Sequence, residues 1–487
     1  MKIARSILFA TLCLAASLAQ SATFTVSSLA DSGAGSLRNA ITQANSAAGA
    51  PHVIAFQPGL SGTITLASEI RISNSMSING PGATLLTLDG ADSTRLLRIE
   101  RTSGAPRSVT ISGLRFIRGF AESGGAIYAF DDDVTILASI FSENGASFRG
   151  GAIFLAEADL TLDGVSIIGN HAPSTGQGSG GGILFSAGTL TVARSYIAQN
   201  TANFGAGMSI VSPRAHAVIT DTLIQDNIAG HTGGGIQAGT MSSFRMSGSA
   251  LVGNFSGQPL GGGLYLTGSN DPAAGAAIIE NTTFSGNVSR HPSGQASALA
   301  ASGGNLIVRN STFALNATAP TTPPVAGLIT GALWVDSTAT TVRIESTLFD
   351  SNTHGNTGVL ADLAHVASSA SNPSIVSATD SLFRTMPGAS EINGDNLRNQ
   401  FATSAQLKPL TTADGGGFVP VHPLARTSPA IDRGSNPGGL IWDQRGAGFV
   451  RAWSDPGYRN DPLNSHADIG AFEYRGDAFF HGDFEQR

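Results

Sequence analysis

An apolar residue followed three positions later by asparagine recurs eight times between residues 141 and 352, and this repeat strongly constrains the fold. Successive asparagines are 26, 30, 27, 27, 33, 29 and 36 residues apart. A period of this length is typical of a solenoid in which each repeat forms one supersecondary unit. The repeated asparagines are Asn144, Asn170, Asn200, Asn227, Asn254, Asn287, Asn316 and Asn352.

Each repeat also carries two strand signals. Apolar residues two positions apart, such as Val134 and Ile136, precede each asparagine and predict a strand with one face inward. Glycines that lead into an apolar residue predict a sharp turn followed by a second strand. No interval leaves room for a crossover helix, so a helical solenoid is not favoured. The glycine segments are 124–127, 150–153, 180–183, 205–208, 233–236 and 261–264.

Two or three short strands per coil of about 30 residues predict an all-β parallel β-helix with about eight clear coils. Asparagines at one place in every coil would stack about 4.8 Å apart, where each side chain can bond the next and satisfy buried turn amides. We therefore interpret them as a structural ladder. The link from asparagine to glycine turn is short at 145–149 and long at 317–330. Such variation predicts a binding surface along that edge.

The N-terminus has the features of a secretory signal peptide over residues 1–22. Lys2 and Arg5 precede an apolar stretch at 7–18, and small residues at 19–22 suit cleavage. A membrane anchor is the alternative, but this stretch is shorter than the roughly 20 residues that span a bilayer. We expect an exported, extracellular or cell-surface protein, including an outer-membrane location, with no transmembrane helix in the mature chain.

The mature chain divides into four predicted parts: 23–110, an N-terminal cap with the first coils; 111–400, the repeats; 401–475, a C-terminal cap; and 476–487, a tail. The tail is interpreted as a sorting signal or a frayed terminus. In the first part, a helix over 36–45 is predicted to cover the first coil. It has Ser36 as N-cap and one apolar face, made of Leu37, Ala40, Ile41 and Ala44.

Charged residues of the predicted C-terminal cap have two interpretations, an active site and a salt-bridged structural network. We favour the network because these residues lie outside the repeated face. They are Asp432, Asp443, Arg445, Asp468 and Glu473.

Three sets of sequence motifs resemble known families. GGAI at 124–127 and FSEN at 141–144 resemble the paired repeats of chlamydial polymorphic membrane proteins and related bacterial right-handed β-helix proteins. TFTVSSLADSGAGSLRNAITQAN at 23–45 resembles the N-terminus of CSLREA-type secreted β-helix proteins. SPAIDRG, DQRG and DIGAFE within 428–473 resemble the choice-of-anchor Q domain. The resemblance implies a right-handed β-helix that is secreted or displayed on a bacterial surface.

The charge balance argues against nucleic acid as a partner. Without Lys2 and Arg5 the chain keeps 25 basic and 34 acidic residues, and Lys408 is its one remaining lysine. We expect a monomer that serves in adhesin-like binding or structural display, with a polysaccharide or a host or cell-surface ligand. An outward column in the second strand supplies candidate binding residues, because aromatic side chains stack on sugars or dock apolar partners. Loops that cover the column are the alternative. The candidates are Tyr128, Phe154, Tyr265 and Trp334.

An enzyme acting on acidic polysaccharide, either a lyase or a glycoside hydrolase, is the alternative function. Hydrolysis with inversion needs two carboxyl groups about 6.5–9.5 Å apart. The best candidates are Asp131, Asp132 and Asp133, with Asp159 or Asp163 one coil later, although a solvated acidic turn is the preferred interpretation.

A lyase would instead need a base that removes a proton beside a carboxylate. Arginines on the coils are candidates, although single surface arginines are usually solubilising. We favour a non-enzymatic role, leave the enzyme as the alternative, and expect no cofactor. We also expect no metal, because neither HExxH nor a GGxGxD series is present. The candidate arginines are Arg149, Arg194, Arg245 and Arg309.

Overall fold

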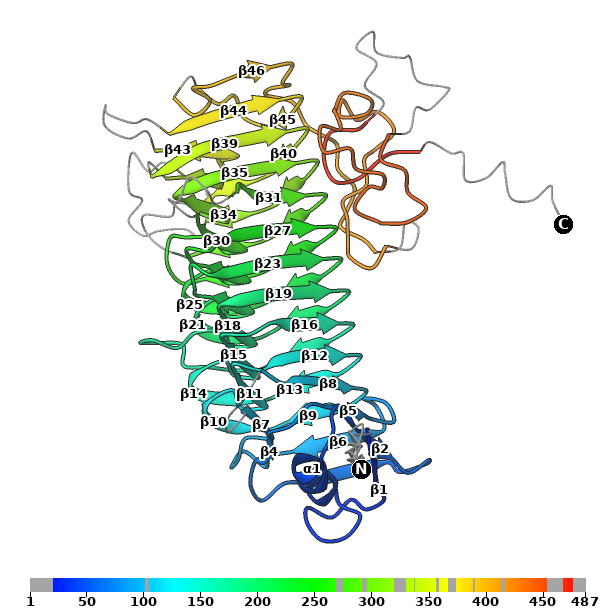
Figure 1. Cartoon of the computed structure of the whole chain (residues 1–487). Helices are drawn as coiled ribbons and strands as arrows, with labels where there is room; N and C mark the ends of the chain where they lie inside the picture. Colours follow the sequence, from blue (N-terminus) through cyan, green and yellow to red (C-terminus); the bar gives the residue numbers. More distant parts are fainter. Residues whose placement is uncertain are drawn as a thin grey trace, which may run out of the picture.

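The computed structural model describes residues 21–475 except 101–103, 105, 269–274, 291–295, 319–329, 337, 356–358, 367–373, 389, 413–416 and 453–466. Residues 1–20 of the predicted signal peptide and the predicted tail 476–487 lie outside the described residues. The chain winds into an all-β right-handed parallel β-helix of about 11 turns (Figure 1), which confirms the predicted fold class.

Four sheets run along the solenoid. Sheet 1 has 14 strands, in spatial order β1 (Thr23–Val26), β2 (His52–Phe56), β5 (Met76–Asn79), β8 (Ser108–Ser112), β12 (Asp133–Leu137), β16 (Leu160–Asp163), β19 (Gly188–Ala193), β23 (Ala215–Thr220), β27 (Ser243–Ser247), β31 (Ala277–Glu280), β35 (Gly304–Arg309), β39 (Ala339–Glu345), β44 (Ile375–Thr379) and β46 (Asn396–Leu397).

Sheet 2 has 12 strands, β3 (Gly62–Thr65), β6 (Leu86–Asp89), β9 (Arg115–Ile117), β13 (Ile140–Ser142), β17 (Ser166–Ile168), β20 (Tyr196–Ala198), β24 (Leu223–Gln225), β28 (Ala250–Val252), β32 (Thr283–Ser285), β36 (Thr312–Ala314), β40 (Leu348–Asp350) and β45 (Leu382–Phe383). Sheet 3 has 11 strands, β4 (Ile70–Ile72), β7 (Leu97–Glu100), β11 (Ile127–Phe130), β15 (Ile153–Ala156), β18 (Ile183–Ser186), β22 (Met208–Ile210), β26 (Ile236–Ala238), β30 (Leu264–Thr267), β34 (Ala296–Ser302), β38 (Gly331–Val335) and β43 (Leu363–His365).

Sheet 4 consists of a two-stranded and a seven-stranded part that lie in the links between asparagine and glycine turn. A regular coil passes through sheets 1, 2, 4 and 3, as β12, β13, β14 and β15 do. The strands of sheet 4 are β10 (Phe120–Ser123) with β14 (Gly145–Arg149), and β21 (Thr201–Phe204), β25 (Ile228–Thr232), β29 (Phe255–Ser256), β33 (Val288–Ser289), β37 (Ala317–Thr318), β41 (Thr353–His354) and β42 (Val359–Leu360).

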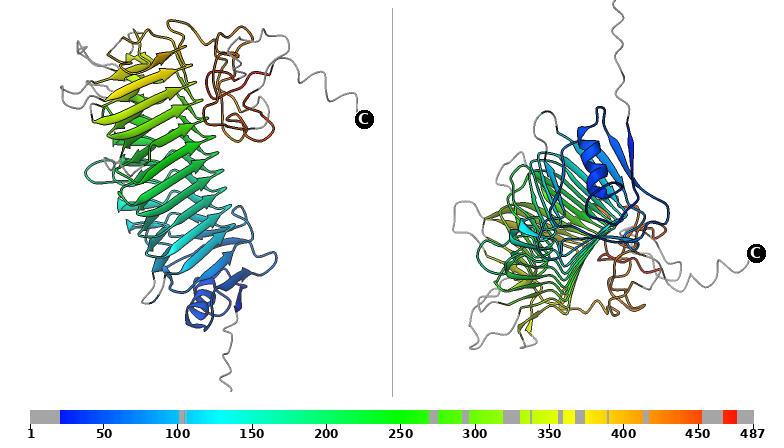
Figure 2. Two further views of the ribbon diagram at one scale, coloured as in Figure 1. Left: turned by 45° about the horizontal axis from the view of Figure 1, so that its top comes forward. Right: turned by 90° about the horizontal axis from the view of Figure 1, so that it is seen from below.

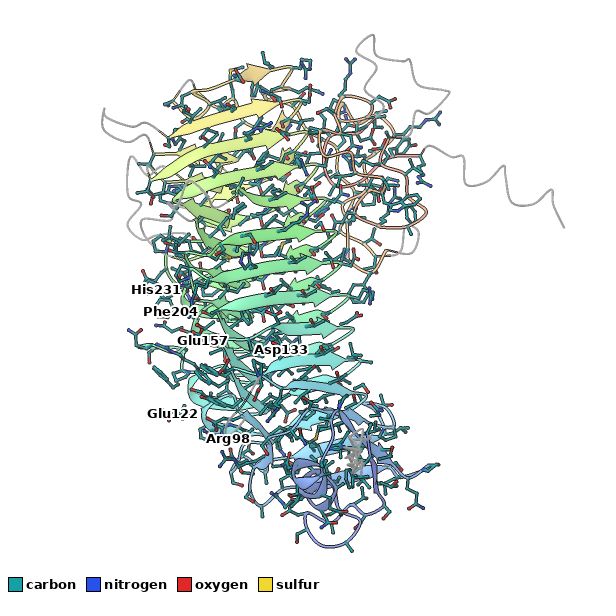
Figure 3. The ribbon with its side chains drawn as sticks, in the orientation of Figure 1. Arg98, Glu122, Asp133, Glu157, Phe204 and His231 are labelled. Atoms are coloured by element: carbon teal, nitrogen blue, oxygen red, sulfur yellow. The ribbon has the colours of Figure 1, made fainter. Side chains whose placement is uncertain are left out.

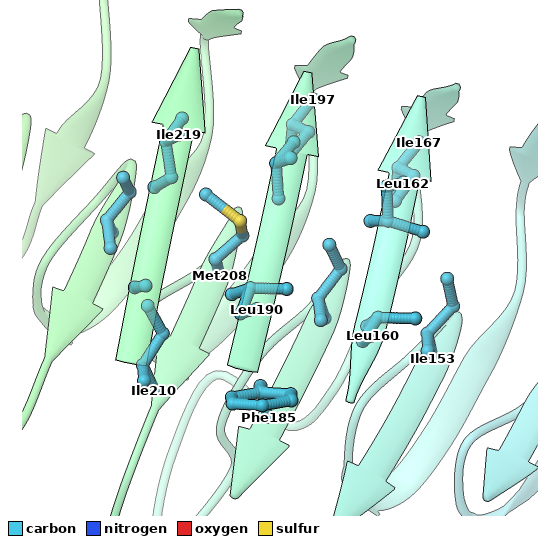
Figure 4. Close-up of a cluster of buried hydrophobic side chains, with 14 of the residues drawn as sticks. Ile153, Leu160, Leu162, Ile167, Phe185, Leu190, Ile197, Met208, Ile210 and Ile219 are labelled. Carbon is cyan, nitrogen blue, oxygen red and sulfur yellow. The ribbon is translucent and has the colours of Figure 1, made fainter. Parts of the chain in front are cut away.

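The interior is filled by the alternating apolar residues of sheets 1, 2 and 3. Leu160 and Leu162 of β16 face Ile153 of β15 and Ile167 of β17, and all four are fully buried (Figure 4). This confirms the inward face predicted from the two-residue alternation. Later coils carry phenylalanine at the sheet 2 position, and these rings stack with centroids 4.6–4.9 Å apart; the stacked rings are Phe284, Phe313, Phe349 and Phe383.

The predicted asparagine ladder is present and fully buried. In each step the side-chain Nδ2 of one asparagine donates to Oδ1 of the next, and the same oxygen accepts the backbone N–H of the first; Asn200 donates both bonds to Asn227 at 2.9 and 3.0 Å. The Nδ2 group also donates to a backbone carbonyl one coil back. After Asn352 the column ends on Asp362, which accepts at 3.0 Å and whose pKa burial raises.

Small hydroxyls form a second ladder at the bend between sheets 1 and 2. Ser195 Oγ donates to the carbonyl of Ala193 at 2.7 Å and accepts the amide of Val165 at 3.2 Å. Arg194, directly before it, is left-handed at φ 46°, a conformation that costs most residues energy and that the hydroxyl bonds help to hold. Equivalent bonds occur at Ser249 and Ser311.

The glycine turns between sheets 4 and 3 require glycine for two reasons. Gly150 has φ 62°, and a Cβ there would lie 2.5 Å from the carbonyl oxygen of Ile153. At the next position a Cβ on Gly151 would lie 2.2 Å from the carbonyl oxygen of Gly181 in the following coil. The turns therefore allow the coils to approach closely.

The predicted helix near the N-terminus is present. Helix α1 (Leu37–Ser46) begins after Ser36, whose side chain accepts the amide of Asn39, and it buries Leu37, Ala40, Ile41 and Ala44. Contacts with β1, β2 and β4 hold it against the first coil. Among the described residues, no helix has the length and apolarity needed to cross a membrane.

The C-terminal region differs from the predicted end cap. Described residues from 404 onward run back along the outer face of sheet 2 beside the later coils (Figures 1 and 2). Gln444 bonds to Thr283 of β32 and to the carbonyl of Ser249, and Ala471 bonds to Thr312 of β36. The open end is instead covered by the segment before this region, where Phe401 stacks on Phe383. The region from 404 therefore braces a flank of the solenoid.

We predict that Asn227→Ala lowers the free energy of unfolding by about 2–4 kcal/mol, because it leaves buried donors and acceptors of two neighbouring coils unsatisfied. The control is Asn305→Ala, the same change at an exposed position of β35, which should cost less than about 0.5 kcal/mol. Urea unfolding of both variants measures the difference. Equal costs would contradict a stabilising role for the ladder.

Candidate functional site

A groove lies where the outer face of sheet 3 meets the links that contain sheet 4. It holds two cavities that meet at Arg149. The first, about 360 Å³, is lined by Arg95, Arg98, Glu122, Ser123, Tyr128, Phe148, Arg149 and Phe154. The second, about 430 Å³, is lined by Arg149, Gln177, Ser179, Leu184, Ser186, Phe204, Ser209, Val211 and Gln237. In Figure 3, Arg98, Glu122, Phe204 and His231 mark this side of the solenoid.

The floor of the groove is one outward column of sheet 3, in which Leu184 and Ser209 are buried and the other members are partly exposed. Strand pairing aligns its members coil by coil, from Arg98 of β7 to Gln237 of β26, as the sequence analysis predicted from Tyr128 onward. The aligned residues are Arg98, Tyr128, Phe154, Leu184, Ser209 and Gln237. The wall comes from the asparagine-to-glycine links, the edge on which a binding surface is expected.

The aromatic residues of this floor are arranged differently from the predicted sugar platform. Tyr128 and Phe154 stack on each other, with centroids 5.1 Å apart and planes 4° apart. The guanidinium groups of Arg95 and Arg98 each lie 5.0 Å from the Tyr128 ring centroid. Because neighbouring side chains occupy the faces of Tyr128, the ring presents its edge and hydroxyl to the groove.

Tyr265 and Trp334 lie farther along the same column, outside the two cavities. Trp334 of β38 is only 5% exposed and packs with Ala300, Ala364 and partly buried Tyr265. These contacts correspond to the covered alternative of the sequence analysis. Trp334 therefore does not offer an exposed ring, whereas Tyr128 and Phe154 line the groove.

Two of the groove's three arginines are neutralised by nearby carboxylates. Arg95 pairs with Glu69 at 2.5 Å and also donates to the carbonyls of Ser123 and Gly124. Arg98 pairs with Glu100 at 2.7 Å, and this hydrogen bond lowers the pKa of the Glu100 carboxyl. Both side chains are thereby fixed beside Tyr128.

Arg149, at the end of β14, is different. It is partly buried, its guanidinium stacks 4.2 Å above the Phe148 ring, and its buried Nε donates no hydrogen bond. No carboxylate among the described residues forms an ion pair with it. The other candidate arginines are all paired: Arg194 with Asp163, and both Arg245 and Arg309 with Glu280.

The candidate carboxylates Asp133 and Asp159 lie one coil apart, and each accepts a backbone amide of the following coil, that of Asp159 and that of Thr189. Strand pairing places Asp163 beside Leu137, four residues along the strand from Asp133, or about 13 Å at 3.3 Å per residue. Asp132 is buried and accepts the amide of Arg107 at 2.6 Å, and Asp133 accepts the amide of Asp159 at 3.0 Å. Asp131 lies in the same turn, with φ 58°. None of these carboxylates is among the residues that line the groove.

The charged residues of the C-terminal region form the structural network favoured above. Buried Asp443 pairs with Arg445 at 2.5 Å, and the Arg445 guanidinium lies between the rings of Phe449 and Phe472. Asp468 accepts the amides of Asp432 and Tyr474, and Glu473 accepts the amide of Asp468. These bonds hold turns of the flanking region together.

Among the residues that the structure describes, no group of three histidine, cysteine, aspartate or glutamate side chains is placed to hold a metal ion. The groove itself therefore offers arginine, carboxamide, hydroxyl and aromatic groups as its chemistry, with Glu122 as the carboxylate lining the first cavity.

Sequence reasoning missed most of the groove wall. Phe148, Gln177, Ser179 and Phe204 lie in links that follow no common pattern from coil to coil. The sequence feature that could have identified these wall residues was their position between each asparagine and the next glycine turn. Arg149 carried the same signal, directly before Gly150, but its lack of a carboxylate partner depends on residues distant in the sequence.

Comparison with known proteins supports the fold assignment. Residues 97–282 match the family model described as a right handed beta helix region, and this stretch includes every lining residue of the two cavities except Arg95. No curated protein matches the chain. The fold class is thus a right-handed parallel β-helix.

We predict that the flanking region loses stability as the pH rises. Burial raises the pKa of Asp468 to about 7, despite the bonds from backbone amides and nearby Arg451. The folded state therefore holds a proton that the unfolded chain releases near pH 4, so stability should fall between about pH 4 and 7. Asp468→Asn should flatten this dependence.

Amide hydrogen exchange of Tyr474 at several pH values measures this effect. Exposed Asp395→Asn is the control for removal of one negative charge and should keep the pH dependence of the wild type. The prediction is contradicted if the Tyr474 amide of the wild type becomes better protected from exchange between pH 4 and 7 than the same amide in Asp468→Asn.

Proposed function

We propose that this protein binds an extended polysaccharide along the groove of sheet 3. The observation that carries the proposal is the pair of cavities, which meet at Arg149 and follow one column of outward residues. From Arg98 to Gln237 the column crosses five coil steps, about 24 Å at 4.8 Å per step. A long, shallow site of this kind suits a polymer that repeats the same contacts better than a compact small molecule.

The lining favours a saccharide over a peptide. Floor strands β11, β15, β18 and β22 pair with strands on both sides, so the groove has no free strand edge along which a peptide could add. It offers side-chain donors and acceptors instead. Exposed Gln177 and partly exposed Gln237 are suited to hydroxyl groups, and the edges of Tyr128 and Phe154 supply apolar contact.

The wider role that we propose is adhesin-like binding or structural display by an exported, monomeric protein at the cell surface. The predicted signal peptide and the resemblances of residues 23–45 and 428–473 support this context. A rigid solenoid with a groove along its axis would present the ligand contacts at a distance from the surface that carries the protein.

A second candidate function is a lyase acting on acidic polysaccharide. The observation in its favour is Arg149, which lies in the groove without a carboxylate partner and is therefore the best placed of the four candidate arginines. Absorbance near 235 nm from unsaturated uronate products distinguishes cleavage from binding alone. Hydrolysis is less favoured, because the first cavity presents the single carboxylate Glu122.

We predict that Ser186→Trp abolishes polysaccharide binding without unfolding the protein. Ser186 lies at the end of β18 and lines the second cavity, which an indole side chain would fill. Thr161→Trp, on the outer face of β16, is the matched control and should bind as the wild type does. Affinity electrophoresis in gels with neutral and acidic polysaccharides measures retardation. Equal retardation of both variants would contradict the location of the site.

A further inference from the structure

We propose that the groove selects anionic polysaccharides and that Arg149 binds the carboxylate or sulfate group of the ligand. This inference rests on the proposed polysaccharide groove and adds the class of ligand. It is carried by the charges of the two cavities and by the environment of a single side chain.

The two cavities differ in charge, and only the second is lined by an arginine without any carboxylate. The second cavity has Arg149 as its one charged lining residue, beside serine, glutamine and apolar side chains. The first adds Arg95, Arg98 and Glu122. Because Arg95 and Arg98 are already paired with carboxylates, Arg149 supplies the unneutralised positive charge at the junction.

The position of the Arg149 guanidinium is fixed before a ligand binds. Its cation stacks on Phe148, and its buried Nε is turned toward protein atoms without a hydrogen-bond acceptor. The terminal nitrogens are thus the groups available to the cavities. Guanidinium nitrogens match two oxygens of a carboxylate or sulfate, and such charge-assisted bonds strengthen where water is partly excluded.

The alternative partner for Arg149 within the protein is Glu122, which lines the same cavity. The two side chains form no ion pair, although β10 and β14 are neighbours and Ser123 pairs with Arg149 in the strand register. An acidic ligand would bind near Arg149 and be repelled by Glu122, which lies toward the first cavity. We therefore place the acidic group of the sugar on the side of the second cavity.

The test compares four proteins with three polymers. The proteins are the wild type, Arg149→Gln, Arg149→Lys and Arg194→Gln; the last removes the same charge from a paired, exposed arginine outside the groove. The polymers are sodium polygalacturonate, its carboxyl-reduced neutral derivative and a sulfated galactan. Titration calorimetry at two salt concentrations gives affinities, and thermal unfolding checks that each variant is folded.

Arg149→Gln should weaken binding of an acidic polymer by about tenfold or more and leave binding of the neutral derivative unchanged. Arg149→Lys should restore only part of the affinity, because lysine lacks the planar pair of donors. Arg194→Gln should behave as the wild type, and added salt should weaken wild-type binding more than Arg149→Gln binding. Preference for one acidic polymer identifies carboxylate or sulfate as the ligand group.

Equal affinity for the neutral and acidic polymers, or equal losses in Arg149→Gln and Arg194→Gln, would overturn the role of Arg149 while leaving a polysaccharide groove intact. No binding of any polymer to the wild type would instead refute the proposed function itself. A folded Arg149→Lys variant keeps the test informative if Arg149→Gln is unstable.

Discussion

The buried asparagine column is the interaction on which the rest of the structure depends. At each turn between sheets 2 and 4, the side-chain oxygen of one asparagine accepts hydrogen bonds from the backbone amide and the carboxamide of the asparagine in the coil before it. The carboxamide also donates to a backbone carbonyl. Because the turn's own polar groups are satisfied before the link begins, the link is free to change in length and sequence. The groove wall is made from these links, and the groove floor is made from the strict register that the column helps to hold.

The contrast between regular strands and variable links explains how a net acidic chain places an unpaired arginine in the second cavity. The surface arginines of sheet 1 are paired with carboxylates in neighbouring coils, as Arg245 and Arg309 are with Glu280. The Glu280 carboxylate is buried and is shared by the two arginines. Arg149 comes from a link, and no carboxylate of the described residues forms an ion pair with it, although Glu122 of the neighbouring coil lines the same cavity. Its charge is left for a ligand, inside a partly enclosed site where screening by water and salt is weaker.

Much of the fold could be predicted because its pattern repeats: the alternation of Val134 and Ile136, the asparagine spacing and the glycine turns each recur. The register of the Tyr128 column followed from the same alignment. The same alignment of repeats also sets Asp163 four residues along the strand from Asp133. The sequence alone could therefore have argued against a catalytic pair of these two carboxylates. The stacking of Tyr128 on Phe154 joins neighbours in the Tyr128 column. The contacts of Arg149 and the docking of the region from 404 could not be predicted, because they depend on tertiary contacts between segments without a common period.

The most direct test of the central claim is a crystal structure of the mature protein with an acidic oligosaccharide of four to six sugars. The account predicts ligand density along the outer face of sheet 3, across the junction of the two cavities, with an acidic group at the terminal nitrogens of Arg149. Ligand bound on sheet 1 or on the flanking C-terminal region, with an empty groove, would contradict it.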